Sequence, residues 1–449
     1  MRGFLKKPVV FILVLLAYAY CAHAQENAAP ERDTGDLVFK LLVFGPSDKI
    51  FIWWGHAALV VENTRWNFSR VFDWGIFSYP SDNFLWDFVN DRVRYRCRAG
   101  PLDLGEYLGE DRDIAAYVLD FDAAGKRAVL DYAENKVLPE NCYYDYHEFR
   151  NNCSTGIRDL IDIGTHGRLR AATEESPGRL SLRQHARRFS WRDPLADWLL
   201  DFLMGQNLDE PVSVWQEMFL PAEIARVAGD FRYADASGAE RKLVASAQIL
   251  NATKTRHPYL QEPLRQWPAC LVLGTFAAMF FARLKTLREK FPRAGRILWG
   301  LGQSLCGLLL GAAGCVLFFA YFLMNNDYVQ QNANILFVNP LLLAAVPLGV
   351  LAALGSPRSI GALGAAAGRA SFPERLLRVL WLYVFVAGSA SLLARVLPGF
   401  FQQNQALLAL VLPVAFVLGH GPDELRAIRA RLRRRGASPT ATGTTDRAE

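Results

Sequence analysis

Cys153 is the residue of this sequence most typical of a chemically active group. It lies in Tyr143-Tyr-Asp-Tyr-His-Glu-Phe-Arg-Asn-Asn-Cys-Ser-Thr-Gly-Ile-Arg-Asp159, directly after a polar Asn-Asn pair. The residues that follow predict an amphipathic helix with Ile157, Leu160 and Ile161 on its buried side. A cysteine in the first turn of a helix feels the positive end of the helix dipole, which favours the nucleophilic thiolate. The same residues are also compatible with a buried structural cysteine.

His56 is the matching candidate for a general base. It follows Trp53-Trp-Gly at the start of a predicted apolar strand, and the glycine permits close approach of another backbone. A histidine at a strand end beside a cysteine at a helix start is the arrangement of papain-like thiol enzymes. The imidazole needs a third polar group to orient it, and Asp73 in the next strand of a predicted hairpin could face it.

Other chemistries have weaker support in the sequence. His147 is a rival base because it is close in sequence to Cys153, although its aromatic segment is expected to be a loop. A serine hydrolase is not indicated, because the chain lacks a Gly-x-Ser-x-Gly motif. A metal site would need several histidines to converge, and no ligand spacing suggests it. The histidines in question are His56, His147, His166 and His185. We expect neither a metal nor another cofactor.

The elements that must position these residues predict an α+β domain. Strands are predicted over residues 36–44, 56–62, 71–77 and 114–121. Helices are predicted over residues 82–91, 104–109, 122–137 and 153–163. Residues 164–262 are expected to be mainly helical. The predicted fold class is therefore a small antiparallel sheet with helices, carried on a helical membrane bundle.

The C-terminal part predicts that bundle. Five apolar runs of near-spanning length occur at residues 267–284, 298–324, 335–354, 377–397 and 404–420. Basic segments follow the first, third and fifth runs, whereas residues 325–334 and 398–405 contain no Lys or Arg. Arg395, near the outer end of the fourth run, is the exception, and its long side chain can reach the interface. Since basic loops stay in the cytoplasm, five spans place residues 25–262 outside it.

The N-terminus independently predicts export. A basic start, the apolar run from Val9 to Tyr20 and Ala22-His-Ala24 form a secretory signal with cleavage after Ala24. An uncleaved anchor would leave the topology unchanged. In an oxidising compartment Cys97 and Cys142 could form a disulfide that leaves Cys153 free, although spacing leaves this open.

Composition agrees with this organisation. The chain of 449 residues is 51% hydrophobic, and its formal net charge of +6 comes largely from Lys/Arg clusters beside the apolar runs. Nucleic-acid binding is therefore not expected. The expected division is a signal peptide (1–24), a Cys/His thiol-enzyme domain (25–165), a helical extension (166–262), a membrane domain (263–422) and a basic, disordered cytoplasmic tail (423–449).

Several segments together resemble the family of Lnb-type N-terminal periplasmic domains. These segments are Gly55-His56 with its apolar strand, Val71-Phe-Asp-Trp-Gly-Ile-Phe77, Tyr144-Asp-Tyr146 and Asn152-Cys-Ser-Thr-Gly-Ile-Arg-Asp159. Weaker similarities at Glu110-Asp-Arg112 and Met218-Phe-Leu-Pro221 extend the resemblance over about residues 36–225. The family is related to circularly permuted NlpC/P60 and lecithin:retinol acyltransferase-like thiol enzymes, in which permutation places the histidine before the cysteine. Trp54, Asp73 and Ser154 depart from the small residue, Asn and Ala that are usual there.

The resemblance implies a membrane-anchored acyltransferase of the inner membrane, with a periplasmic N-terminal domain and a cytoplasmic C-terminus. Cys153 would take an acyl chain from a membrane phospholipid as a thioester and pass it to the N-terminal amine of a diacylglyceryl lipoprotein. His56 would move the protons, while Asn152 and backbone N–H groups at the helix start would stabilise the oxyanion. Arg112, Arg158 and Tyr146 are the implied substrate-binding residues, although either arginine could instead form an ordinary ion pair.

Two alternatives remain open at this point. A membrane-tethered cysteine hydrolase, either a peptidase or amidase or a lipase-like enzyme, would use the same Cys153 and His56 with water as the acceptor. A non-catalytic membrane scaffold or transporter subunit would use neither residue. Few ionisable residues interrupt the apolar runs, which argues against transport.

Overall fold

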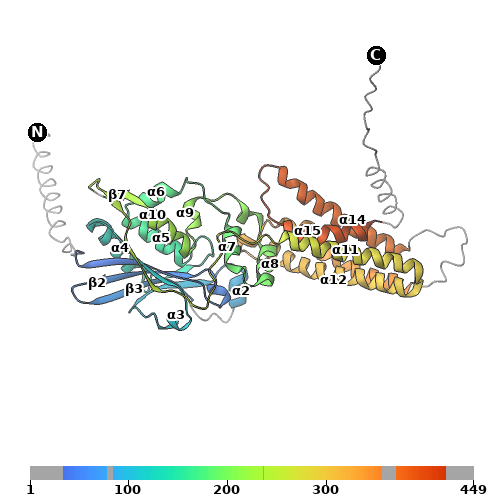
Figure 1. Cartoon of the computed structure of the whole chain (residues 1–449), viewed down its shortest axis with the longest axis horizontal. Coiled ribbons are helices and arrows are strands. Elements are labelled where there is room, and N and C mark those ends of the chain that lie inside the picture. The colour runs from blue at the N-terminus through green and yellow to red at the C-terminus, as the bar shows by residue number, and fades with distance from the viewer. Residues whose placement is uncertain (1–33, 78–83, 236, 356–370, 421–449) are drawn as a thin grey trace, which may run out of the picture.

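The computed structural model describes residues 34–77, 84–235, 237–355 and 371–420. The chain forms a mixed α/β N-terminal part and an elongated helical bundle beside it (Figure 1). The predicted signal peptide and cytoplasmic tail lie outside the described residues, as does most of the predicted basic loop before residue 371.

The N-terminal part is built on one antiparallel sheet of seven strands in the order β6-β4-β3-β2-β1-β5-β9. The strands are β1 (Leu37–Phe44), β2 (His56–Asn63), β3 (Phe68–Phe77), β4 (Arg94–Gly100), β5 (Ile114–Leu119), β6 (Tyr143–Asp145) and β9 (Val244–Asn251). The four predicted strands are all present, and the antiparallel sheet is confirmed.

Side chains alternate between the two faces of the central strands. In β2, Ala57, Leu59 and Val61 belong to the main core under the helices, whereas Ala58 and Val60 pack in a smaller cluster on the opposite face. This period of two, with β-branched residues on both faces, is what an extended chain buried on both sides requires. The 56–62 segment therefore forms a central strand.

The prediction that residues 164–262 are mainly helical was only partly right. β7 (Arg232–Ala234) pairs with β8 (Glu240–Lys242), and β9 extends the main sheet along β5. β9 is an edge strand whose residues after Val244 are mostly exposed, so its sequence lacks the buried face that identifies a strand. Of the predicted helical extension, β9 thus belongs to the main sheet, whereas β7 and β8 form a separate pair.

Nine α-helices are described in the N-terminal part, some between the strands of the sheet and others after them in the chain. They are α2 (Phe84–Val89), α3 (Gly105–Gly109), α4 (Ala123–Lys136), α5 (Cys153–Gly164), α6 (Arg168–Thr173), α7 (Leu182–Ser190), α8 (Pro194–Leu203), α9 (Val214–Glu217) and α10 (Pro221–Asp230). Asp122 caps α4 by accepting a hydrogen bond from the Gly125 N–H, which fixes the start predicted at residue 122.

Four helical segments among the described residues are long and apolar enough to cross a membrane. They are α11 (Trp267–Lys290), α12 (Pro292–Leu323), residues 333–354 with η4 (Ala333–Leu336), η5 (Pro340–Ala344) and α13 (Ala345–Leu354), and α14 (Phe372–Leu393) with η7 (Ala394–Val396). The fifth predicted span forms α15 (Gln405–Gly419), an apolar helix of 15 residues packed beside α11 and α14. At 1.5 Å per residue it covers about 22 Å, less than a hydrocarbon core of about 30 Å.

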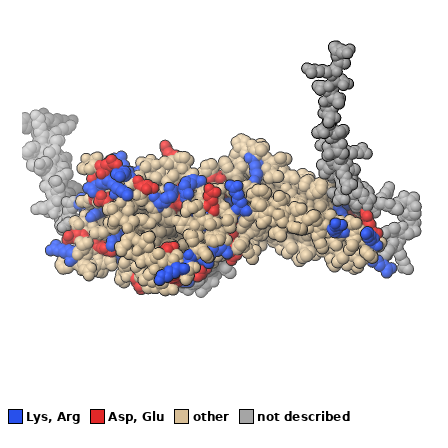
Figure 2. Space-filling model, viewed as in Figure 1, with Lys and Arg blue, Asp and Glu red and all other residues tan. Residues whose placement is uncertain are grey.

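Charge distribution distinguishes the two parts. Figure 2 shows Lys, Arg, Asp and Glu spread over the α/β part, whereas the visible face of the bundle is uncharged along most of its length. Large apolar side chains such as Leu273, Phe276 and Leu309 point outward from the bundle, each more than 60% exposed. Such an exposed apolar surface suits contact with lipid.

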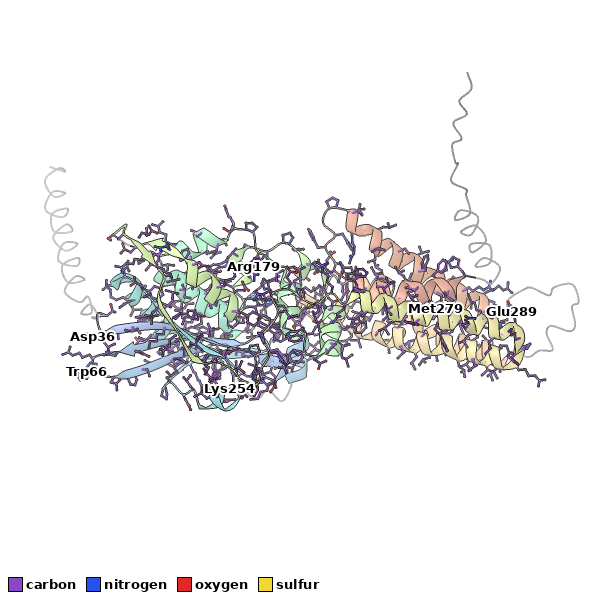
Figure 3. All side chains as sticks on the ribbon, viewed as in Figure 1. Asp36, Trp66, Arg179, Lys254, Met279 and Glu289 are labelled. Atoms are coloured by element: carbon purple, nitrogen blue, oxygen red, sulfur yellow. The ribbon has the colours of Figure 1, made fainter. Side chains whose placement is uncertain are left out.

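One end of the sheet faces the bundle. Asp36, just before β1, and Trp66, in the β2–β3 turn, lie at the end remote from the membrane helices (Figure 3). Since β2 begins at the other end, His56 lies on the membrane-proximal side of the α/β part.

Candidate functional site

The structure brings three of the predicted residues together at the membrane-proximal end of the sheet. His56 is the first residue of β2, Asp73 lies in β3, and Cys153 is the first residue of α5. Strands β2 and β3 are antiparallel neighbours with Ala58 opposite Asp73, and α5 packs against both strands. The order of the elements therefore places a thiol, an imidazole and a carboxylate at one sheet end.

Asp73 holds the His56 ring. The Asp73 Oδ1 lies 2.7 Å from the His56 Nε2, and only 8% of the Asp73 side chain and 16% of the His56 side chain are exposed. Burial by itself would lower the pKa of His56. The negative charges of Asp73 and the Cys153 thiolate, with hydrogen bonds to both, raise that pKa well above its ordinary value.

The Cys153 thiol is half-buried and activated. Burial by itself would raise the pKa of Cys153, but the charge of the His56 imidazolium, a hydrogen bond to the ring and the Ala57 N–H together lower it. The opposite shifts of the two groups favour a thiolate–imidazolium pair. Because Nε2 of His56 faces Asp73, Nδ1 is the ring nitrogen left for the sulfur.

Two glycines make room for this pair. Gly55 has φ +83°, and a Cβ there would lie 2.5 Å from the Phe44 carbonyl oxygen, so the backbone turn before His56 requires glycine. Gly75 has φ +87°, and its Cβ would lie 3.3 Å from the Cβ of Cys153. Sequence reasoning missed Gly75, although a glycine two residues after Asp73 inside a strand is a recognised signal of close approach.

Arg98 and three tyrosines interact with Asp73 or Cys153, and of these four residues Tyr146 alone was a predicted site residue. The Arg98 Nη2 lies 4.0 Å from the Asp73 Oδ2. Tyr146, the predicted substrate-binding residue, stacks on Tyr95 with ring centroids 4.0 Å apart. Burial raises the pKa of Tyr95 to about 12, and burial with the nearby Cys153 thiolate raises that of Tyr146 well above its ordinary value. Burial raises the pKa of Tyr144 as well. These phenols are therefore neutral near neutral pH and available as hydrogen-bond donors.

Asn152 has a capping role. Its Oδ1 accepts from the Thr155 N–H at 2.9 Å, and the Thr155 hydroxyl accepts from the Asn152 N–H at 2.8 Å, which completes a capping box. Its amide nitrogen donates to the carbonyls of Glu148 and Phe219. The side-chain amide expected to bind an oxyanion is thus engaged in holding the start of α5.

The two arginines implied as substrate-binding residues are buried in structural contacts. The Arg112 Nε donates to the Gly45 carbonyl at 2.9 Å, and its guanidinium lies 4.9 Å from the Tyr107 ring centroid. The Arg158 guanidinium lies 3.9 Å from the Trp215 ring centroid and donates to Asp159. The alternative of ordinary structural partners, weighed above, describes both residues.

The remaining histidines point to different carboxylates. His147 contacts Asp327, His166 contacts Asp122 and His185 contacts Glu217. The backbone N–H groups of Phe149 and Arg150 donate to the other ring nitrogen of His147, so this rival base is occupied on both sides. Across the described ranges, no group of three or more His, Cys, Asp or Glu residues could hold a metal ion.

Cys97 and Cys142 are neighbours but not bonded. Both are buried free thiols, and the Cys97 N–H donates to the Cys142 carbonyl at 2.8 Å across the end of the β4–β6 pair. Burial raises the pKa of Cys97 to about 12, opposite in direction to Cys153. The surroundings of Cys153 thus lower the pKa of its thiol, whereas those of Cys97 raise it.

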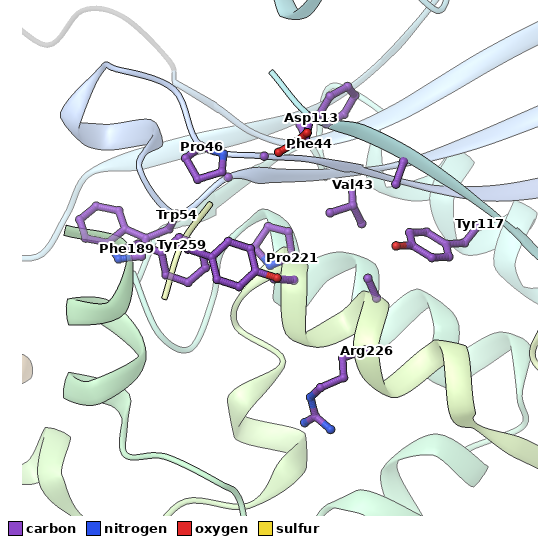
Figure 4. A pocket seen from close by; sticks show the side chains of 15 residues that line it. Val43, Phe44, Pro46, Trp54, Asp113, Tyr117, Phe189, Pro221, Arg226 and Tyr259 are labelled. Atoms are coloured by element: carbon purple, nitrogen blue, oxygen red, sulfur yellow. The ribbon is translucent and has the colours of Figure 1, made fainter. Parts of the chain in front are cut away.

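A cavity of about 380 Å³ is lined by residues of β1, α7 and α10 and by the segment just before His56 (Figure 4). Its lining includes Phe44, Trp54, Gly55, Tyr117, Pro221 and Tyr259. Phe44 also stacks on the His56 ring, with ring centroids 5.9 Å apart, and Gly55 immediately precedes His56. Arg226 at its edge already pairs with Glu223 at 2.7 Å, so the cavity presents mainly apolar and aromatic surface.

Comparison with known proteins adds a family to this geometry. Residues 24–191 match the family model described as the Lnb N-terminal periplasmic domain. The matched segment runs from before β1 into the residue after α7 and contains His56, Asp73 and Cys153. Neither the curated proteins nor the solved structures include a match to this chain.

Proposed function

We propose, from the premise that residues 24–191 are an Lnb-type N-terminal periplasmic domain, that this membrane-anchored protein is a cysteine acyltransferase. In this proposal Cys153 accepts an acyl chain from a membrane phospholipid and passes it to the N-terminal amine of a diacylglyceryl lipoprotein. The observation that carries the proposal is the His56–Asp73 pair beside the activated Cys153, at the sheet end that faces the membrane helices.

The first half-reaction uses the thiolate–imidazolium pair. The Cys153 sulfur attacks the ester carbonyl of the phospholipid, a C–S bond forms, and the C–O bond breaks as the lysophospholipid leaves. The His56 imidazolium gives its proton to the departing alkoxide oxygen, so the ring becomes neutral. Asp73 keeps the ring oriented throughout.

Backbone donors suit the oxyanion of this step. The first N–H groups of a helix have no acceptor within the helix, and the Thr155 N–H is taken by Asn152. The N–H groups of Cys153 and Ser154 at the start of α5 are therefore the proposed donors, and Tyr146 is a further neutral donor beside the sulfur.

The second half-reaction returns the enzyme to its starting state. The neutral amine of the lipoprotein attacks the thioester carbonyl, His56 accepts a proton from the attacking nitrogen, and the C–S bond breaks to release the Cys153 thiolate. The product is an N-acylated lipoprotein, and the imidazolium is restored. No cofactor enters either step.

The membrane bundle supplies the setting for this chemistry. Both substrates reside in a bilayer, and tethering the thiol site to membrane helices raises its effective concentration at the lipid surface. We further propose that the bundle lies in the inner membrane and that α15 crosses it together with the four longer helices. With five spans and a periplasmic N-terminal domain, the C-terminus would lie in the cytoplasm. A circularly permuted NlpC/P60-like arrangement would explain why the His56 strand precedes the Cys153 helix.

Mass spectrometry of the purified full-length protein tests the proposal. We expect an acyl mass on the peptide containing Cys153 that hydroxylamine removes, and loss of the adduct in Cys153→Ser. In a host deficient in lipoprotein N-acylation, the wild-type chain should restore acylated lipoprotein N-termini and Cys153→Ser should not. Cleavage of cell-wall peptides or release of free fatty acid, without any adduct or N-acylation, would refute the transferase and establish the hydrolase.

A further inference from the structure

The short hairpin before Cys153 is held by side-chain contacts from the membrane part. We call residues 147–152 the nucleophile hairpin and residues 324–332, which connect α12 to the third apolar segment, the outer loop. The hairpin is closed by paired backbone hydrogen bonds of 3.0 Å between His147 and Asn151. Asn152 then joins it to α5, because its amide donates to the Glu148 carbonyl while its Oδ1 caps the helix. A movement of this hairpin therefore moves Cys153.

Asp327 and Tyr328 of the outer loop contact four side chains of the nucleophile hairpin. The Asp327 Oδ1 lies 3.0 Å from the His147 Nε2, and Arg150 donates to the Asp327 Oδ2 at 2.6 Å. The Tyr328 hydroxyl donates to Glu148 at 3.3 Å. The Tyr328 ring also contacts the rings of His147 and Phe149, with both pairs of ring centroids 6.0 Å apart.

The outer loop is itself fixed on the soluble part at a separate place. The Gly205 N–H donates to the Tyr328 carbonyl at 2.8 Å, and the Asn207 side chain donates to the Asp327 carbonyl at 2.8 Å. Asn332 donates to the carbonyls of Phe202, Leu203 and Met204. The loop thus rests on residues 202–207 and reaches from there to the hairpin.

We propose that Asp327 is a positioning residue of the thiol site, through which the membrane part sets the placement of Cys153 relative to His56. Asp327 contacts neither Cys153 nor His56. It acts through His147 and Arg150, which belong to the nucleophile hairpin. The inference rests on the proposed function only in taking Cys153 as the nucleophile. It makes the outer loop a component of the active site as well as a connection between membrane helices.

The side chains involved favour positioning over stabilisation. Arg150 is 68% exposed and Asp327 34% exposed, so their ion pair is largely solvated and adds little to the stability of the fold. Removing the Asp327 carboxylate is therefore expected to leave the protein folded while freeing the hairpin. This separation makes the proposal testable with single substitutions.

The test is the alkylation rate of Cys153 by iodoacetamide in the full-length protein, followed by peptide mass spectrometry across a range of pH. Misplacing the sulfur weakens its pairing with His56 and raises its pKa, and at pH values below the thiol pKa each unit of increase lowers the thiolate fraction about tenfold. We expect Asp327→Ala to slow Cys153 alkylation by about that factor and to move its pH profile upward, with Asp327→Asn retaining part of the rate.

Asn207→Ala is the matched control, because it removes a hydrogen bond to the backbone of Asp327 and leaves the carboxylate on the hairpin. It should alkylate at the wild-type rate. The buried thiol of Cys97 should stay unlabelled in all variants, which reports an intact fold. Arg150→Ala combined with Asp327→Ala should slow the reaction less than the two separate effects multiplied, since both act through one contact.

The outcomes separate this inference from the proposed function. If Cys153 of the wild-type chain reacts no faster than Cys153 of a His56→Ala variant, the proposed thiol activation itself fails. If the wild-type thiol reacts quickly and Asp327→Ala reacts equally quickly, only the positioning role is overturned. Equal slowing by Asn207→Ala and Asp327→Ala would also overturn it, because loosening of the loop in general would then explain the effect.

Discussion

His56 and Asp73 lie diagonally across the β2–β3 pair on the same face of the sheet. Ala58 is opposite Asp73, so His56 is two residues removed from that pairing, and its ring reaches back to place Nε2 2.7 Å from Oδ1. Diagonal neighbours in antiparallel strands are within reach of long or aromatic side chains. The imidazole therefore owes its orientation to the strand register as well as to its own rotamer.

Asp73→Asn tests the electrostatic part of that contact. The amide can still hydrogen-bond to the ring, but the negative charge that raises the pKa of His56 is lost. The imidazolium becomes less stable. The His56 charge lowers the pKa of Cys153 more strongly than the Asp73 charge raises it, so below the thiol pKa we expect Cys153 alkylation to slow by up to about tenfold for each unit by which the pKa of His56 falls. An unchanged rate would show that the Asp73 charge does not support the ion pair.

Gly75→Ala should impair the site through geometry. The new Cβ would lie 3.3 Å from the Cβ of Cys153 on a backbone with φ +87°, a conformation that alanine adopts only at a cost. Displacement of reacting atoms by about 1 Å can lower rates about 100-fold, and we expect a loss of this order in thioester formation. Gly100→Ala in β4 is the control, since its Cβ would meet nothing within 4 Å.

The pH dependence of Cys153 alkylation follows from the direction of its pKa shift. The reactive thiolate is present above the thiol pKa, which lies below the ordinary value of 9.0. Wild-type alkylation should therefore persist at pH values where an ordinary thiol is protonated and unreactive. In His56→Ala the stabilising charge is absent and burial acts unopposed by it, so the inflection should move upward. A profile that His56→Ala leaves in place would contradict the pairing.

The buried carboxylate of Glu217 is expected to make the α/β part sensitive to acid. Burial would raise its pKa, but hydrogen bonds from His185 and from the backbone of Leu180 and Arg179 lower it. Its contribution to stability is therefore present above the unfolded-state value near 4.5 and is lost as the pH falls through the lowered folded value. Glu217→Ala should cost about 3–5 kcal/mol in the free energy of unfolding, because it leaves buried partners uncompensated. Thermal unfolding at neutral pH would measure this loss. Glu174→Ala, which removes an exposed pair with Arg170, should change little.

The parts of the site formed by residues close together in the sequence could be predicted. The strands of His56 and Asp73 form one hairpin with a short turn, so their adjacency could be read from the chain. The capped start of α5 was visible in the polar residues before Cys153. The resemblance to the Lnb-type family, expected over about residues 36–225, was confirmed by the match over residues 24–191, and the predicted antiparallel sheet with helices was confirmed with it.

Long-range contacts could not be predicted in this way. The Asp327–His147 contact joins residues 180 positions apart, and neither segment carries a pattern that identifies the other. Arg98 lies in β4, a strand whose alternating charged residues do not mark it as part of a core. From its residue type alone, the side chain of Asn152 could bind an oxyanion or cap a helix. Only the folded structure shows that its amide nitrogen is occupied by the carbonyls of Glu148 and Phe219.

The position of β9 has a consequence for how the protein is made and how it can be dissected. Residues 24–191 contain β5 but not its outer neighbour, because β9 is supplied by Val244–Asn251, shortly before α11. A fragment cut at residue 191 would present the open side of β5 to other chains, a typical start of aggregation. During synthesis the sheet stays incomplete until nearly all the chain before α11 has been made, so we expect closure of the sheet and entry of the first long helix into the bilayer to follow one another directly.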